Sequence, residues 1–268
     1  MFLSRRRVTG DDQQQRPQVL DCKIQKVCCL VIPSAWVHDL SAYLLYLQVL
    51  FNQTATLQYL EYSDHLPDLT GFTLHYWLHL LQPSSLACPF TYYNEADDTY
   101  VQVLIVSSGV NTWSWVLQIN DVVVSLVQSP VNLIGKWHHV LHSWHSGTGS
   151  WSVYLDGRLV DSSVNTQTKG LVVSGGGRAF SGHRQRVIRG SDKCVDGDEG
   201  LYGWLTLLSL DTRGIERGDY WMNRMMVVVV ADGCRPELGG DALSWYHTPR
   251  RGYGGVMEAR ANTTCGLF

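Results

Sequence analysis

The sequence lacks an apolar run long enough to cross a bilayer. Residues 1–17 are polar, and the apolar stretch Val27–Phe51 is interrupted by Pro33 and by His38-Asp39. A membrane-spanning helix needs about 20 predominantly apolar residues in succession, so neither segment predicts one. Residues 1–17 contain no apolar signal core. The second stretch leaves open an internal signal-like segment, and a truncated or mis-spliced start is the alternative.

Charged residues are also scarce. They make up 17% of the 268 residues against 45% hydrophobic residues, which excludes a disordered chain. The net charge of -3 gives no reason to expect nucleic acid or an anionic membrane as a partner.

The usual catalytic motifs are absent. There is no Gly-x-Ser-x-Gly elbow and no His-Glu-x-x-His, and Gly175–Gly177 lacks the Lys-Ser/Thr that ends a phosphate loop, which indicates a turn. Four histidines cluster in one predicted strand, but alternation puts His138 and His142 on one face and His139 and His145 on the other. This spacing does not gather the ligands of a zinc site.

Trp and Tyr are plentiful, with ten and thirteen against six Phe, and both favour strands. Short extended runs bounded by Gly, Asp, Asn and Ser predict an antiparallel sandwich. Asp156-Gly157 predicts a hairpin turn, because both residues tolerate positive φ. The predicted strands are Thr56–Tyr62, Phe72–Leu81, Phe90–Tyr93, Tyr100–Val106, Thr112–Ile119, Val122–Val127, Trp137–Trp144 and Trp151–Leu155.

One segment, Ile215–Val230, has helical spacing of its large apolar residues and predicts an amphipathic helix packed on a sheet. A Val-rich strand over Val227–Val230 is the alternative. The regular pattern predicts one domain over residues 47–268, preceded by a segment of uncertain status over residues 1–46.

Seven cysteines and two Asn-x-Thr sequons, at Asn52 and Asn262, indicate an oxidising, glycosylating compartment and therefore a secreted or extracellular chain. Because seven is odd, at least one thiol is free or pairs with another chain.

The segment His139–Ser146 resembles the pentraxin signature His-x-Cys-x-Ser/Thr-Trp-x-Ser/Thr, with Leu141 in place of the cysteine. Leu66–Leu74 resembles the lead into the family's first core strand, and Gly149–Val160 resembles the hairpin after the signature. Leu243-Ser244-Trp245 matches the tryptophan that follows the family's helix. These matches occur in the family's order from about residue 47 to the end.

The resemblance implies an all-β fold: a two-sheet antiparallel jelly-roll sandwich of the concanavalin A and laminin G type, with one helix packed near the C-terminal end. It also implies a non-enzymatic extracellular recognition module that binds a protein, a glycan or a phosphate-bearing ligand, and leaves open a homo-oligomer. The alternatives are a carbohydrate-active enzyme on the same fold and a spacer or assembly domain without a ligand.

By the same resemblance, the family joins the signature cysteine to one on the earlier core strand. The matching residues here are Leu141 and His75, so the two should be neighbours on adjacent strands. Cys234 and Cys265 match a pair of the long pentraxins. A Cys88–Cys194 bond is a speculation, and the pairing of Cys22, Cys28 and Cys29 is open.

Calcium is the cofactor that the resemblance implies. Asp98 matches the first ligand and Thr99 the asparagine beside it, with Asp97 as a spare carboxylate. Gln185 matches a residue that binds through its carbonyl, and Asp196 and Glu199 match ligands of a second ion. Two acidic ligands are replaced by Arg184 and Arg186. A guanidinium offers no acceptor oxygen, so calcium binding is expected to be weak or absent.

Three alternatives remain at this site. The arginines could pair with the acidic residues without metal and present a positive patch, or the residues could form no site at all. A shift of the alignment by a residue or two would instead build one site from Asp192, Asp196 and Asp198.

The Cys234–Cys265 pair can be tested on the secreted protein. We expect non-reducing peptide mapping to recover the two cysteines in one linked peptide. Alkylation of Cys234 as a free thiol in the folded chain would contradict the expectation.

Overall fold

The computed structural model describes residues 46–52, 57–109, 111–184, 200–215 and 240–261. Contacts between residues divide the chain into Met1–Ser41 and Ala42–Phe268, and all of the described residues belong to the second unit.

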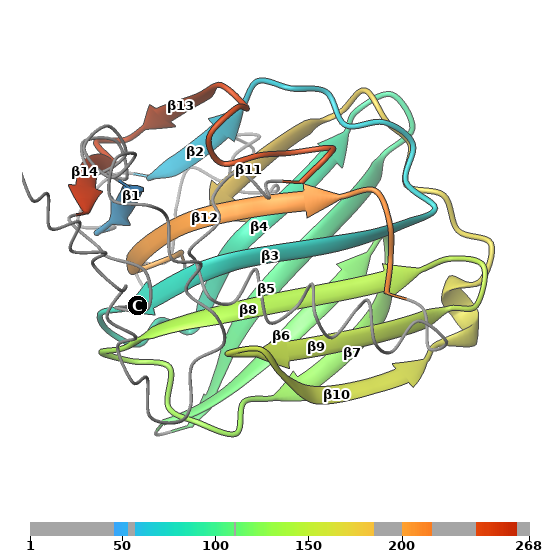
Figure 1. Cartoon of the computed structure of the whole chain (residues 1–268), viewed down its shortest axis with the longest axis horizontal. Helices are drawn as coiled ribbons and strands as arrows, with labels where there is room; N and C mark the ends of the chain where they lie inside the picture. The colour runs from blue at the N-terminus through green and yellow to red at the C-terminus, as the bar shows by residue number, and fades with distance from the viewer. Residues whose placement is uncertain (1–45, 53–56, 110, 185–199, 216–239, 262–268) are drawn as a thin grey trace, which may run out of the picture. The chain divides into compact units, whose positions relative to one another are not determined.

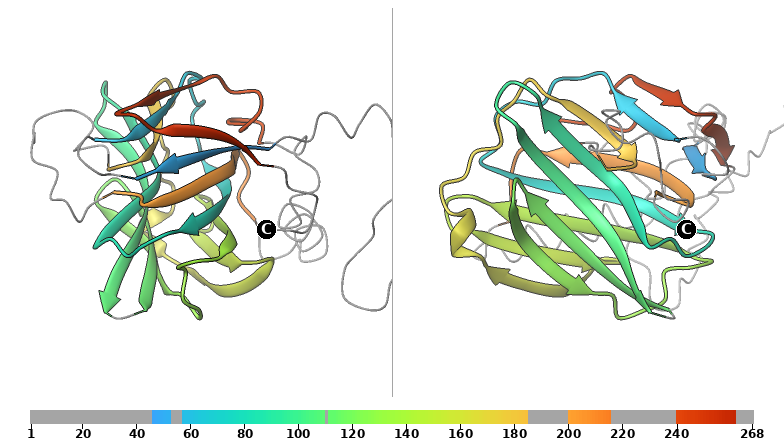
Figure 2. Two further views of the ribbon diagram at one scale, coloured as in Figure 1. Left: turned by 90° about the vertical axis from the view of Figure 1, so that its left-hand side faces the viewer. Right: turned by 180° about the vertical axis from the view of Figure 1, so that it is seen from behind.

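The described residues form two antiparallel sheets of seven strands each, packed face to face as a jelly roll (Figures 1 and 2). Sheet A has the order β10-β9-β8-β3-β12-β1-β14. Its strands are β1 (Tyr46–Phe51), β3 (Gly71–Leu80), β8 (Trp137–His145), β9 (Ser150–Leu155), β10 (Arg158–Val164), β12 (Gly203–Asp211) and β14 (Met257–Ala261).

Sheet B has the order β13-β2-β11-β4-β5-β6-β7 and forms the layer nearer the viewer in the right panel of Figure 2. Its strands are β2 (Tyr59–Tyr62), β4 (Leu86–Asn94), β5 (Thr99–Gly109), β6 (Thr112–Ile119), β7 (Val122–Gln128), β11 (Arg178–Gly182) and β13 (Arg250–Tyr253). A short 3-10 helix, η1 (Thr166–Thr168), follows β10.

The predicted sandwich is therefore confirmed, and the eight predicted strands are all present. Six further strands, β1 and β10 to β14, were not predicted. The last residues of the apolar stretch Val27–Phe51 form β1, which pairs with β12 and β14. The predicted helix, except for Ile215, lies outside the described residues. Within the described ranges, no helix is long and apolar enough to span a membrane.

The core lies between the inner faces of the two sheets and is rich in large aromatic side chains. Phe72 and Trp144, for example, face each other in the register of β3 and β8, with ring centroids 5.7 Å apart. Full burial of such side chains is a main source of stability in a sandwich. The largest fully buried side chains are Trp113, Trp115, Trp144, Trp245, Tyr76, Tyr92, Phe51, Phe72 and Phe90.

Strands β3 and β8 are buried on both faces. Their register pairs His75 with Leu141, which confirms the predicted neighbours at the place of the missing disulfide. Both side chains are buried on the outer face of sheet A, where Leu141 packs against Tyr154 and Ile215. Side-chain packing therefore occupies the position at which the resemblance implies a disulfide.

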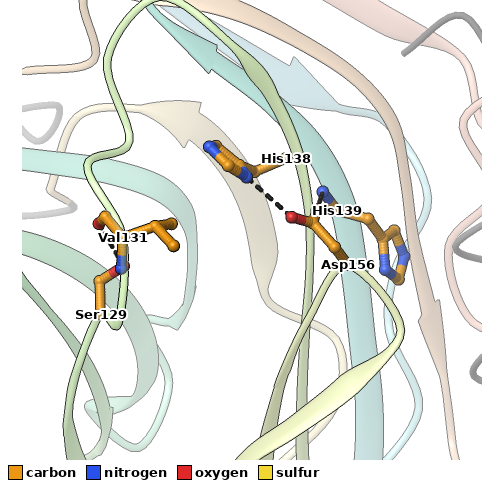
Figure 3. A network of polar contacts seen from close by, with 5 residues as sticks. All are labelled: Ser129, Val131, His138, His139 and Asp156. Atoms are coloured by element: carbon orange, nitrogen blue, oxygen red, sulfur yellow. Dashed lines mark hydrogen bonds and ion pairs between the residues drawn. The ribbon is translucent and has the colours of Figure 1, made fainter.

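The hairpin predicted at Asp156-Gly157 joins β9 to β10, and both residues have positive φ, 49° and 74°. The Asp156 carboxylate also holds the neighbouring strand (Figure 3). Its Oδ1 accepts a hydrogen bond from the backbone N of His139, and its Oδ2 lies 2.9 Å from His138 Nδ1. The turn residue therefore fixes the start of β8.

The register predicts that a disulfide can be restored. We expect a His75→Cys/Leu141→Cys variant to oxidise spontaneously, because paired positions on an antiparallel ladder lie about 4.5–5.5 Å apart between Cβ atoms. Closing this long loop should raise the free energy of unfolding by roughly 4 kcal/mol over the reduced form. Denaturant titration with and without reductant measures the difference.

A His75→Cys/Val140→Cys variant is the matched control, because Val140 pairs with Tyr76 and points to the opposite face. Free thiols in both variants would show that the register is wrong.

Candidate functional site

The first predicted calcium ligands lie in the turn between β4 and β5. Asp98 has a φ of 59°, in the left-handed region that only a few residue types tolerate. Its Oδ1 accepts a hydrogen bond of 2.9 Å from the Tyr93 hydroxyl. The backbone N of Thr99 donates to Asp97 Oδ1 at 3.2 Å. Both carboxylates of the turn are therefore engaged by the chain itself.

Asp97 is further held by Ser174, on the segment that leads into the Gly-rich run. Side-chain hydrogen bonds with Ser174 and Thr99 hold the pKa of the Asp97 carboxyl below its ordinary value, although the group is exposed. These hydrogen bonds favour the ionised form of Asp97 without a metal ion.

The Gly-rich run Gly175–Gly177 forms bends and is held by three side chains, two from the end of β4 and one from the segment between β2 and β3. The Tyr92 hydroxyl donates to Ser174 O at 2.6 Å and accepts from Gly177 N at 2.8 Å. Asn94 Nδ2 donates to Gly175 O at 2.6 Å. Asp68 Oδ1 accepts from Gly175 N at 2.7 Å. These bonds and the one between Asp97 and Ser174 join the β4–β5 turn, the run, the end of β4 and Asp68 into one unit, which we name the loop frame.

Only glycine fits at two positions of this run. A Cβ on Gly177 would lie 2.4 Å from Tyr93 O, and one on Gly175 would lie 2.6 Å from Leu66 O. The run that the sequence assigned to a turn is thus a close packing of backbone on backbone.

Arg184 lies at the other end of β4 from Asp98. In the register of β11 and β4, Arg178 pairs with Tyr93 and Gly182 pairs with Cys88. Tyr93 and Cys88 are five residue steps apart along β4, or about 16 Å. The structure therefore does not bring Arg184 next to Asp98.

The remaining predicted metal-site residues, Gln185, Arg186, Asp196 and Glu199, lie outside the described residues, as do Asp192 and Asp198 of the shifted register. Within the described ranges, no three His, Cys, Asp or Glu side chains are grouped so that they could hold one metal ion.

Arg178, which the sequence did not single out, pairs with Tyr93 and so lies beside the loop frame. Its Nε donates to Glu61 Oε1 at 2.8 Å, and its guanidinium lies 5.2 Å from the centroid of the Phe180 ring. Rings continue across the outer face of sheet B from Phe180 to Tyr59 and Tyr253, at centroid distances of 6.0 and 4.6 Å. Arg178 and Phe180 are two residues apart in β11 and therefore share one face of the strand, which was the signal that could have located this cluster.

Arg251 closes the far end of this row of rings, 5.1 Å from the Tyr253 centroid. The Tyr253 hydroxyl donates to Glu61 Oε2, so both oxygens of Glu61 have partners. The row pins the edge strand β13 to the sheet, and its polar groups largely satisfy one another.

The cysteine and sequon predictions fall mostly outside the described residues, which include neither Cys234, Cys265, Cys194 nor Asn262. Cys88 is a free, buried thiol that donates to Phe90 O at 3.4 Å, so the Cys88–Cys194 speculation is wrong. Asn52 is half-buried, and its Oδ1 accepts from Gln58 Nε2 at 2.7 Å.

Within the described ranges, the histidines are not grouped as ligands of one metal ion. The register confirms the predicted alternation: His138 and His142 pair with Leu78 and Leu74 on the inner face, whereas His139 pairs with Trp77 on the outer face.

Comparison with known proteins agrees with this architecture. Residues 54–197, more than half of the chain, match the family model of the concanavalin A-like lectin/glucanases superfamily. The chain belongs to this superfamily.

Within the superfamily, the similar proteins are pentraxins. C-reactive protein 1.4 of Limulus polyphemus is 26% identical over 199 residues, which cover 72% of this chain and 75% of that protein. The mouse sushi, von Willebrand factor type A, EGF and pentraxin domain-containing protein 1 is 28% identical over 199 residues. The match covers 73% of this chain but only 5% of that protein's length.

Solved structures confirm the fold. The native heptameric SAP-like pentraxin of Limulus polyphemus matches with a TM-score of 0.70 and 21% identity, over 83% of this chain and 98% of that one. The full extracellular region of zebrafish Gpr126/Adgrg6 matches with a TM-score of 0.60 and 17% identity, over 83% of this chain and 27% of that one.

The loop frame can be tested through its central hydroxyl. We expect Tyr92→Phe to lower the free energy of unfolding by about 1–3 kcal/mol, because it leaves Ser174 O and Gly177 N without their partner. Tyr93→Phe is the control, since the exposed Asp98 carboxylate that it releases is hydrated by water. Urea titration compares the two variants, and equal losses would contradict the central role of Tyr92.

Proposed function

We propose that the chain is a non-enzymatic extracellular recognition module of pentraxin type, which binds its ligand at the loop frame and the adjoining outer face of sheet B. The observation that carries this proposal is the loop frame itself. The hydrogen bonds of Tyr92, Asn94 and Asp68 hold two loops in one arrangement, and a binding surface that is already ordered loses less conformational entropy on binding.

The ligand is a protein, a glycan or a phosphate-bearing molecule. The Asp97 and Asp98 carboxylates lie at the frame, and the adjoining face carries the Arg178 guanidinium. The Arg178 side chain is 62% exposed, and of its five N–H donors Glu61 takes only some. Arginine recognises carboxylate and phosphate groups through paired donors. Assembly into a homo-oligomer belongs to the same proposal, and the heptameric Limulus pentraxin supports it.

Calcium takes little or no part in this binding. The ion prefers six to eight oxygen ligands, and Asp97 and Asp98 already accept hydrogen bonds from Thr99 and Tyr93. Arg184 and Arg186 stand where the resemblance implies acidic ligands. Among the described residues, Asp97, Asp98 and Thr99 would be the ones to hold a calcium ion.

Calorimetric titration with calcium, with and without chelator, tests this part of the proposal. We expect millimolar or undetectable affinity for the chain and for Asp98→Ala alike. Asp121→Ala is the matched control, because Asp121 is an exposed carboxylate that accepts a hydrogen bond from the Tyr100 hydroxyl on the same sheet. Micromolar calcium affinity that disappears only in Asp98→Ala would overturn the proposal that ligand binding does not depend on calcium.

Recognition itself is tested on immobilised glycans and phosphate-bearing lipids in the presence of chelator. We expect binding that Tyr92→Phe weakens and Arg158→Ala, on the edge strand of sheet A, leaves unchanged. Loss of binding in chelator, or equal binding by all variants, would contradict the proposed surface.

A further inference from the structure

Four histidines are buried on the two adjacent strands at the centre of sheet A, and one of them, His138, is paired with Asp156. Among the described residues, the other three have no acidic partner. His139 and His142 are fully buried on β8, and His75 is 5% exposed on β3. His75 and His139 lie on the outer face with ring centroids 5.5 Å apart, and His142 lies on the inner face against Tyr76. Buried imidazoles therefore occupy both sides of one strand pair.

These rings lack the partners that would stabilise a charge. Both ring nitrogens of His75 and of His139 are buried without a hydrogen-bond partner, as is Nδ1 of His142. His142 Nε2 lies 3.3 Å from the Tyr76 hydroxyl. A buried cation without a hydrogen bond or an opposite charge costs several kcal/mol.

The polar neighbours of the outer pair do not compensate for a charge. Register neighbours on β12 are Ser209 opposite His75 and Thr206 opposite Trp77, and Tyr154 of β9 lies opposite Leu141. Of the carboxylates, Asp156 binds His138 and the backbone of His139. Asp211 lies opposite Thr73 as the last residue of β12, two register positions beyond Ser209 and His75.

On the inner face, the titratable groups near His142 are the Tyr76 hydroxyl and, close to it, the Cys88 thiol of β4. Burial raises the pKa of Cys88 to about 12 and that of Tyr76 well above its ordinary value, so both stay neutral in acid. Neither can balance a charge on His142.

We propose that the β3–β8 strand pair is an acid sensor. The imidazoles of His75, His139 and His142 permit the closed sandwich only while they are uncharged, so the domain opens reversibly when its surroundings become acidic.

The direction of the pH dependence follows from burial. Burial lowers the pKa of His75 to about 4 and that of His142 to about 3, and burial together with the nearby His75 lowers the pKa of His139 well below 6.5. Because the folded pKa values lie below the unfolded value of 6.5, the stability is fully present above pH 6.5. The free energy of unfolding decreases as the pH falls from 6.5 towards 4, because the unfolded chain then binds protons that the folded chain cannot bind.

At pH 5 each such histidine favours the open chain by about 30-fold relative to pH 7.5. Three of them together shift the equilibrium by on the order of 10⁴-fold. Equilibrium constants of about 10³–10⁸ hold small domains folded, so the shift is large enough to open this one in a mildly acidic compartment.

Denaturant unfolding of the full chain, followed by tryptophan fluorescence between pH 7.5 and 4.5, tests the proposal. We expect the pH dependence to report about one fewer proton taken up on unfolding at pH 5 for His75→Leu, and about two fewer for His75→Leu/His139→Leu. His247→Leu is the control, because His247 is exposed in the loop after Trp245 and should keep the wild-type slope. Equal slopes in all four proteins would overturn the proposal, whatever the stabilities at pH 7.5.

A second measurement does not depend on the variants folding. In the wild-type chain we expect three imidazole resonances that do not titrate down to pH 5 while the protein stays folded, and a return of the native spectrum when the pH is restored to 7.5. Titration of all imidazoles near pH 6.5 in the folded chain, or irreversible loss of the spectrum, would overturn the proposal.

Discussion

The ladder between β3 and β8 is buried on both of its faces, and the rest of the domain depends on that constraint. On the inner side, Phe72 and Trp144 meet in the core. On the outer side, His75 and Leu141 meet where a sandwich strand usually faces water. A slip of one residue would exchange the two faces, so the pairing has one register. The neighbouring strands β9 and β12 take their registers from this pair.

Burial on the outer face also explains how β3 and β8 are held together without the disulfide that the resemblance implied. A disulfide of that loop length contributes roughly 2–4 kcal/mol. Burying one large apolar side chain contributes about 1.5–3 kcal/mol. Leu141 packs against Tyr154 and Ile215, and four tryptophans are fully buried in the core. The packing is therefore of the right size to offset the missing bond, at the cost of enclosing imidazoles that have to remain neutral.

The two sheets carry different features of the domain. Sheet B carries the loop frame, whose order comes from the Tyr92 hydroxyl and from glycines that admit no Cβ. Sheet A carries the histidines. The layers meet in the core where the Tyr76 hydroxyl lies between His142 and the region of Cys88. Opening of the β3–β8 pair would remove the support beneath β4, the strand that ends in the loop frame.

Much of this protein was determined by local sequence. Alternation and turn residues predicted eight strands and the Asp156-Gly157 hairpin, because strand period and positive φ are properties of a few neighbouring residues. The signature around His139 predicted the family and, through it, the pairing of His75 with Leu141. Tertiary structure decided what depends on distant partners. The pairing of β12 with β3, the separation of Arg184 from Asp98 along β4, and the capture of Asp98 by Tyr93 all follow from sheet register. Register is set by contacts between segments far apart in the chain, and no local pattern contains that information.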